Sequence, residues 1–218
     1  MPTPGPEAPA RLTAAALALA LAGCGSYTTY QSAEPLPRGR WQGAAALGAG
    51  AFADHPGDTR TPSLHVEVAA RRGVGAGTDV GLKLYALGVE ASVRHRLHAT
   101  AAGWSVAALG ALGGVRTTGR GSLPDALSGH ARATAAITRR TSPRRAWSFG
   151  PVVTASLYLP AAGGHATGLL AGAFVNLSWS FGGCWHLVPE LSVHRTIHGD
   201  VPVDGAVVQT GVGLARDF

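Results

Sequence analysis

Cysteine, charge and aromatic residues are scarce in this 218-residue chain, which has two cysteines, 14% charged residues and 6% aromatic residues. The charged fraction lies well below the roughly 25% of an ordinary soluble domain. Hydrophobic residues nevertheless make up 46% of the chain. Beyond residue 23 no apolar run approaches the roughly 20 residues that a membrane-spanning helix needs, which excludes a helical membrane anchor there. A chain this apolar can instead spread its hydrophobic residues over alternating positions of β-strands.

An apolar run close to the N-terminus ends in the residues Leu21-Ala22-Gly23-Cys24. The run is too short to cross a bilayer as a helix, and small residues precede the cysteine, as at the cleavage site of a secretory leader. The four residues resemble the lipobox of bacterial lipoproteins. The resemblance implies that residues 1–23 are a signal peptide, that cleavage precedes Cys24, and that lipid is attached to the sulfur and amino group of Cys24. The alternative is a short buried helix followed by a cysteine.

Acylation of Cys24 would leave Cys184, the other cysteine, without a partner in its own chain, so no intrachain disulfide is expected. Residues 24–40 include Pro35 and Pro37 and show no periodic pattern, which predicts an extended, lipid-anchored tether. The net charge of +6 comes almost entirely from arginine. For an exported chain the expected partner of these arginines is anionic lipid, and nucleic acid is not expected.

Apolar and polar residues alternate from residue 41 onward, which is the period of a β-strand. Within residues 64–71, for example, every even position is apolar. The alternation predicts ten strands, at residues 41–53, 62–72, 77–85, 88–97, 103–116, 129–140, 147–159, 167–181, 184–195 and 205–218. The fold class expected for residues 41–218 is all-β, a single antiparallel transmembrane up-and-down β-barrel of about ten strands. The alternative is a periplasmic lipoprotein with a soluble β-sandwich or small barrel.

The expected connections are mostly long on one side of the strands and short on the other, and the chain ends in Phe218. These features resemble the small outer-membrane β-barrels of Gram-negative bacteria. The resemblance implies an outer-membrane location, with membrane lipid around the barrel and at Cys24. It also implies assembly by the barrel-insertion and lipoprotein-sorting machineries, with Phe218 as the C-terminal assembly signal. It implies neither catalytic residues nor a cofactor.

Six charged residues on three neighbouring predicted strands fall on the face expected to line the lumen: Glu67, Arg71, Asp79, Lys83, Glu90 and Arg94. One register for each hairpin sets opposite charges side by side in two rows, Glu67–Lys83–Glu90 and Arg71–Asp79–Arg94. We expect this charge ladder to fill the lumen and stiffen the wall. The alternative is an ion path, which alternating charges serve poorly because they cancel.

No motif predicts catalysis or a metal site. Glu190, Ser192 and His194 share one strand face, but alternate side chains along a strand lie about 7 Å apart, beyond hydrogen-bond reach. The nine histidines show no metal-ligand spacing. The expected role is therefore structural or surface binding, and a narrow channel or a lipid-modifying enzyme is a more distant alternative.

Tryptophan and proline mark the predicted strands in different ways. The five tryptophans lie near strand ends, four of them near ends expected to face the periplasm, which predicts an interfacial aromatic girdle. Pro151 and Pro189 each remove a backbone donor inside a predicted strand, so a bulge or a break is expected at Pro189.

Overall fold

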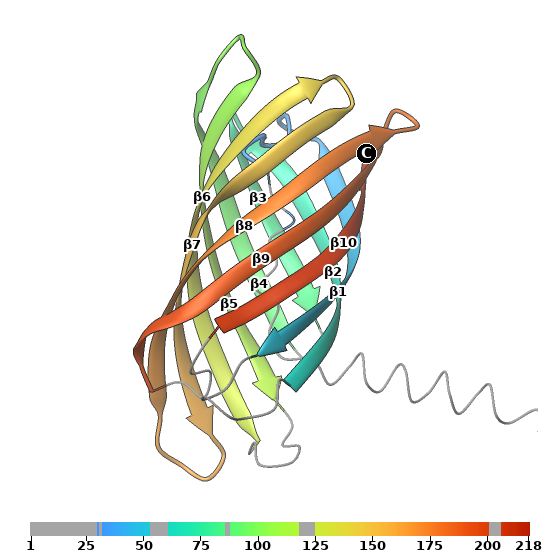
Figure 1. The fold of residues 1–218 in the computed structure, drawn as a ribbon. Coiled ribbons are helices and arrows are strands. Elements are labelled where there is room, and N and C mark those ends of the chain that lie inside the picture. The colour runs from blue at the N-terminus through green and yellow to red at the C-terminus, as the bar shows by residue number, and fades with distance from the viewer. Residues whose placement is uncertain (1–29, 31, 53–60, 86–87, 118–124, 201–205) are drawn as a thin grey trace, which may run out of the picture.

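The computed structural model describes residue 30 and residues 32–52, 61–85, 88–117, 125–200 and 206–218. These residues form ten strands in one closed antiparallel barrel (Figure 1). The strands are β1 (Trp41–Phe52), β2 (Thr61–Gly75), β3 (Thr78–Tyr85), β4 (Gly88–Ala99), β5 (Trp104–Thr117), β6 (Ala126–Ser142), β7 (Arg145–Pro160), β8 (Ala166–Phe181), β9 (Trp185–Gly199) and β10 (Ala206–Asp217). The predicted all-β barrel and its strand number are confirmed. Among the described residues there is no helix long and apolar enough to cross a membrane.

The two ends of the barrel differ in their connections. At the turn end, uppermost in Figure 1, four short turns join the strands, and Trp41 and the C-terminus lie beside them. The turn between β8 and β9 is the clearest case, because Gly182 and Gly183 adopt φ angles of 57° and 80° that favour glycine. At the opposite end, here called the loop end, most connections are longer. Strands β6 and β9 extend further toward the loop end than predicted.

The barrel closes through antiparallel pairing of β1 with β10, from Gln42 opposite Asp217 to Phe52 opposite Val207. Phe218 extends this pairing beyond the strand. Its N–H donates to the carbonyl of Trp41 at 2.8 Å, and the Trp41 N–H donates to the Phe218 carbonyl at 3.3 Å. The predicted closure is thus observed, and it leaves no free sheet edge.

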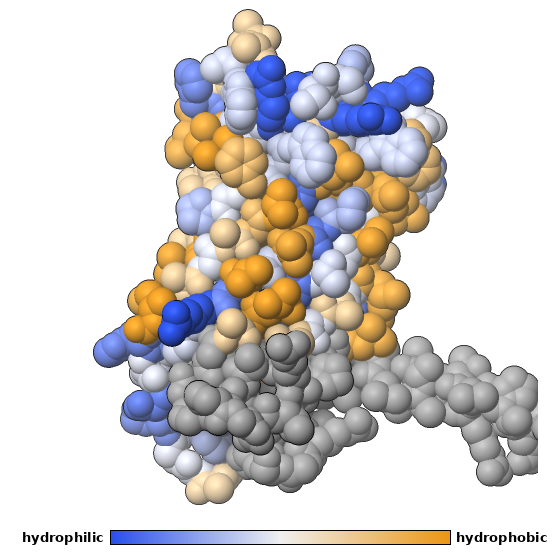
Figure 2. Space-filling model, viewed as in Figure 1, coloured by the Kyte–Doolittle hydropathy of each residue, from blue (hydrophilic) through white to orange (hydrophobic). Residues whose placement is uncertain are grey.

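The barrel is polar inside and apolar outside. Among the described residues, 30 large hydrophobic side chains are exposed, whereas 17 polar or charged residues and 15 hydrophobic ones are buried. Seven of the 15 buried hydrophobic residues are alanines. Figure 2 shows the apolar side chains over the barrel wall and hydrophilic ones concentrated at the turn end. Proteins surrounded by water rarely expose apolar patches of this extent. This surface is therefore suited to a hydrocarbon environment.

The register of β3 with β4 is the predicted one, with Asp79 opposite Arg94 and Lys83 opposite Glu90. The register predicted for β2 and β3 is wrong by two residues, because Glu67 lies opposite Tyr85 and not opposite Lys83. The turn lies at residues 76–77 and not at 73–76, and this turn together with a one-residue bulge between Gly73 and Gly75 sets the observed register. An even shift keeps every side chain on its face, so the lumen-facing set is unchanged.

The two strand prolines interrupt pairing without shifting the register. The β6–β7 ladder passes from Thr134↔Val152 to Ile137↔Phe149, skipping the pair opposite Pro151. The β8–β9 ladder likewise lacks pairs at Pro189, yet β9 runs through it unbroken. The bulge or break expected at Pro189 is therefore wrong. The lost donor is accommodated because hydrogen bonds above and below hold the strand in place.

Candidate functional site

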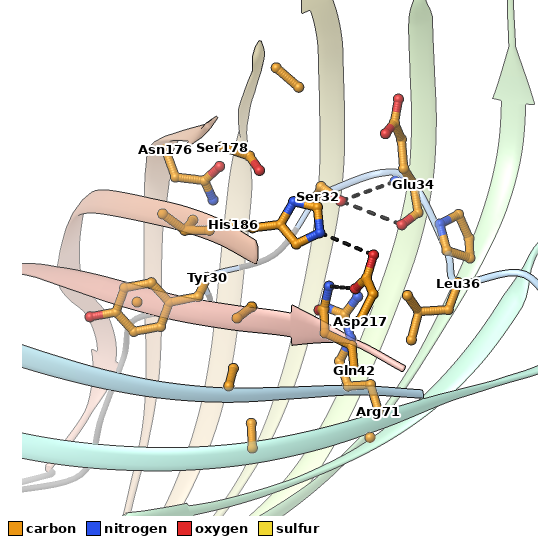
Figure 3. Close-up of a pocket in the computed structure, with 18 of the residues that line it drawn as sticks. Tyr30, Ser32, Glu34, Leu36, Gln42, Arg71, Asn176, Ser178, His186 and Asp217 are labelled. Atoms are coloured by element: carbon orange, nitrogen blue, oxygen red, sulfur yellow. Dashed lines mark hydrogen bonds and ion pairs between the residues drawn. The ribbon is translucent and has the colours of Figure 1, made fainter. Parts of the chain in front are cut away.

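The lumen contains part of the chain itself. Tyr30 and residues 32–37, here called the lumen segment, lie inside the barrel before β1 begins. Figure 3 shows Ser32, Glu34 and Leu36 on a stretch of chain that crosses the lumen between the strands. The described part of the predicted tether at 24–40 is therefore packed inside the barrel, a position that the sequence analysis did not foresee.

Side chains of the barrel wall hold the backbone of the lumen segment. The Tyr30 N–H donates to Glu190 Oε2 at 2.6 Å, the Ala33 N–H to Thr138 Oγ1 at 2.7 Å, and the Leu36 N–H to Asp79 Oδ2 at 2.9 Å. Arg94 Nη1 donates to the carbonyl of Ser32 at 2.7 Å, and Glu34 forms an ion pair with Arg140. Wall groups from four strands thus supply the partners that an extended buried segment cannot supply for itself.

Apolar packing fixes the middle of the lumen segment. Ala33 is fully buried in a small cluster with Ala107, Ala136, Val152 and Phe174, from strands β5 to β8. The charged side of the lumen, on β2 to β4, faces this cluster from across the barrel. The segment therefore contacts both the small apolar cluster and the charged side chains of the lumen.

At the turn end, the backbone that follows the lumen segment lies directly against β2. Arg38 forms a parallel bridge with Gly73, and Gly39 N–H donates to the Gly73 carbonyl at 2.8 Å. A Cβ atom at Gly73 would collide with the backbone carbonyls of Leu36 and Pro37. Glycine at this position therefore lets the two backbones approach.

The six predicted lumen charges meet in two groups of three, one around Lys83 and one around Asp79. Lys83 Nζ lies 3.5 Å from Glu67 Oε2 and 3.4 Å from Glu90 Oε1. Asp79 lies against Arg94 and is 3.7 Å from Arg71. The contacts to β2 are diagonal, because long side chains reach a neighbour two residues away on the facing strand. The same six residues therefore meet although the β2–β3 register differs from the predicted one.

Glu90 is the centre of a larger network that the sequence analysis missed. Besides Lys83, it contacts Arg132 in an ion pair and His130 Nε2 at 3.0 Å, both from β6. These residues lie two strands away, and the residue between them on β5 is Gly113. Because Gly113 has no side chain, Glu90 and His130 meet over the strand that separates them. Only the pairing order of β4, β5 and β6 could have revealed this contact.

The same arrangement recurs in the lumen, where a glycine lies opposite a large polar side chain on the next strand. A Cβ atom at each glycine would collide with the ring or side chain that faces it. The pairs are Gly48 with His65, Gly81 with Arg71, Gly113 with His130 and Gly172 with His194. Ten strands leave a lumen only wide enough for side chains, so these glycines provide the space for the long ones.

A chamber of about 450 Å³ remains inside the barrel, lined by the lumen segment, by charge-ladder residues such as Lys83 and Glu90, and by wall residues near the turn end. His186, Asp217 and Gln42 line its wall in Figure 3, close to the lumen segment. Ser180 Oγ lies 2.9 Å from His186 Nδ1, His186 Nε2 lies 3.0 Å from Asp217 Oδ2, and Gln42 donates to Asp217 Oδ1 at 2.8 Å. This hydrogen-bonded chain joins β8, β9, β10 and β1 across the closure of the barrel.

The Ser180–His186–Asp217 chain has the residue types of an acyl-transfer site, and the sequence analysis missed it. The cross-strand pairing of Ser180 with His186 next to the β8–β9 turn is the signal that could have found it. Acyl transfer also needs N–H donors for the developing oxyanion. The Ser180 N–H is already bonded to the Arg144 carbonyl at 2.8 Å. Ser180, His186 and Asp217 thus link three neighbouring strands by hydrogen bonds.

The remaining predicted residues have the following positions. Glu190 binds the Tyr30 N–H and Asn176 Nδ2, the latter at 3.1 Å, while Ser192 and His194 are buried in the lumen wall. No group of three or more His, Cys, Asp or Glu side chains suited to a metal occurs within the described ranges. Cys184 is a free thiol in the β8–β9 turn. Cys24 and the predicted leader at 1–23 lie outside the described residues.

The tryptophans gather at one end only. All five, Trp41, Trp104, Trp147, Trp179 and Trp185, lie at the turn-end termini of their strands, where four were expected. Four of them are 40–47% exposed on the outer face. The loop end has no tryptophan among its described residues.

Comparison with known proteins finds no matching family model and no curated protein that matches in sequence. Solved structures of outer-membrane proteins are similar in fold at low identity. Ail of Yersinia pestis is 11% identical, with 84% of this chain and 100% of Ail covered at a TM-score of 0.43. Neisserial surface protein A is 10% identical, with 82% and 97% covered at a TM-score of 0.46. An outer membrane channel of Pseudomonas putida F1 is 13% identical, with 85% and 98% covered at a TM-score of 0.47.

Proposed function

We propose that this protein is a closed outer-membrane β-barrel, held to the membrane additionally by lipid on Cys24, with a structural or surface-binding role. The observation that supports the proposal is the lumen segment inside the barrel. It donates three backbone N–H groups to Glu190, Thr138 and Asp79, and the charge ladder lies on the wall beside it. A barrel built for transport would leave a continuous path lined by polar groups.

The exterior supports insertion in a membrane. The exposed hydrophobic side chains alternate with buried positions along the strands. The alternation is clearest on β7, where exposed and buried residues alternate one by one from Arg145 to Ala155. Nine of the ten strands have 12 or more residues, more than the roughly 9–11 that cross the hydrocarbon core. In this arrangement the short turns and the C-terminus would lie in the periplasm and the longer connections at the cell surface, as is usual for outer-membrane barrels.

Conductance across a planar bilayer tests the closed lumen. The wild-type protein is expected to stay closed, and a variant lacking residues 30–37 is expected to pass ions, since the deletion removes the lumen segment and retains Cys24. A deletion of residues 161–165, in a loop-end connection, is the control and should stay closed. Steady conductance of the wild-type protein would overturn the proposal.

Membrane insertion and lipid attachment are tested separately. A Cys24→Ala variant should still migrate on an unheated gel as a folded barrel and remain in the detergent fraction. Release of this variant as a soluble protein would instead favour the periplasmic lipoprotein. Mass spectrometry of the purified wild-type protein should find an acylated N-terminus at Cys24, and an unmodified Met1 would exclude the lipid anchor.

A further inference from the structure

Arginines stack on the tryptophans at the turn end of the barrel. The Cζ atom of Arg72 lies 5.3 Å from the ring centroid of Trp41, and that of Arg139 lies 5.0 Å from Trp104. Arg145 lies 5.9 Å from the ring of Trp179. All of these are cation–π distances. Each pair joins neighbouring strands on the outer face, so the stacking is a feature of the assembled barrel.

The densest part of this arrangement lies where the barrel closes. Arg216 of β10 is 5.3 Å from the ring of Trp185 on β9 and 5.0 Å from the ring of Phe218. Phe218 is hydrogen-bonded through its backbone to Trp41 on β1, whose ring carries Arg72 of β2. Three aromatic rings and two guanidinium groups thus lie side by side across four adjacent strands.

Together these residues form a collar around most of the barrel. Following the barrel from β5 through β10 and β1 to β2, eight of the ten strands contribute to it. The collar consists of Trp41, Arg72, Trp104, Arg139, Arg145, Trp147, Trp179, Trp185, Arg216 and Phe218.

The collar is cationic, because its side chains include four arginines and no acidic residue. The acidic side chains nearest this end, Glu34, Asp79 and Asp217, are paired with other residues, namely Arg140, Arg94 and His186. Among the described residues the four collar arginines form no ion pair. Figure 2 shows the hydrophilic surface at this end directly above the apolar wall.

We infer that the collar binds the phosphate groups of anionic phospholipids in the membrane leaflet at the turn end. Tryptophan at a barrel end marks the level of the lipid headgroups. A guanidinium group held over an aromatic ring can still donate N–H groups, and its edge matches a phosphate in a bidentate way. Arg139 already donates one N–H to the Ala102 carbonyl at 2.6 Å. The stacking also orients the arginine in advance, which lowers the entropy lost on binding. The inference rests on the membrane insertion proposed above.

Quenching of tryptophan fluorescence by brominated lipid measures this preference. All five tryptophans lie at the turn end, so the signal reports on the collar alone. The full-length protein is reconstituted in phosphatidylcholine vesicles that contain equal fractions of either brominated phosphatidylglycerol or brominated phosphatidylcholine. The wild-type protein should bind the anionic lipid more tightly. One arginine beside an anionic headgroup accounts for at most about a fivefold difference.

Matched charge changes at the two ends test the site. An R72Q/R216Q variant should lose at least about threefold of the preference for the anionic lipid. An R116Q/R195Q variant, which removes the same charge from the outer face near the loop end, should retain it. Equal losses in both variants would mean that net charge alone is responsible and would overturn the inference.

Two further measurements keep the result interpretable. If R72Q/R216Q does not fold, R72K/R216K keeps the charge but loses the stacked, bidentate geometry, and an unchanged preference in it would overturn the inference. Flotation with the vesicles distinguishes the two proposals. A protein that does not float refutes membrane insertion, whereas one that floats without any preference for the anionic lipid refutes the collar alone.

Discussion

Replacing Glu90 by Gln should destabilise the barrel more than any single change at its surface. The Glu90 carboxylate contacts Lys83 at 3.4 Å, His130 at 3.0 Å and Arg132 in an ion pair. The side chains of Glu90 and Arg132 are only 4% and 6% exposed. Removal of one partner from such a buried pair leaves an uncompensated charge, at a cost of about 3–5 kcal/mol, whereas an exposed pair contributes about 0–1 kcal/mol. Lys83 keeps Glu67 at 3.5 Å, so Arg132 bears most of the loss.

Urea unfolding of the protein in lipid vesicles, followed by tryptophan fluorescence, measures the free energy of unfolding. The E90Q variant should unfold about 3–5 kcal/mol more easily than wild type. An E90Q/R132Q double variant should recover part of that loss, because it also removes the buried guanidinium group that had lost its ion pair with Glu90. Arg116→Gln on the outer face is the control. A loss below about 1 kcal/mol for E90Q, or strictly additive effects in the double variant, would refute the account of Glu90 as the centre of the network.

Three other predictions follow from the lumen and from the barrel closure. Gly211→Val should displace the Tyr30 ring, whose hydroxyl occupies the space of a Cβ atom there, and bilayer conductance should then rise above that of wild type. His186→Ala should lower the free energy of unfolding by no more than about 1 kcal/mol, because His186 and Asp217 are 21% and 29% exposed; a loss of several kcal/mol would contradict this. Deletion of Phe218 should reduce the amount of assembled barrel in the outer membrane while leaving export unchanged, as measured by fractionation and gel migration, and normal assembly would exclude Phe218 as a signal.

The alternation of the sequence predicted most of the fold because the faces of a strand repeat every two residues. A local pattern therefore assigns each side chain to the lumen or to the exterior without knowledge of the partners. The final strand illustrates this: Val208, Val212 and Leu214 face outward and Gln209 is buried. The connections at 76–77 and 182–184 were close to the predicted turns for the same reason.

Register was less predictable than face. The charges on β3 and β4 predicted the observed pairs of Asp79 with Arg94 and Lys83 with Glu90. The same reasoning failed for β2 and β3, because a long side chain can reach its partner diagonally and so tolerates a shift by two residues. Charge complementarity alone does not distinguish these registers.

What the sequence by itself determined is the strand number, the closed antiparallel barrel and the polar lumen, all of which follow from alternation along each strand. The tertiary structure alone decided which residues meet across the lumen. The contacts of Tyr30 with Glu190 and of Glu90 with Arg132 join residues far apart in the chain. They exist because closure brings non-adjacent strands around one narrow space, and because glycines such as Gly113 leave room for the long side chains that fill it.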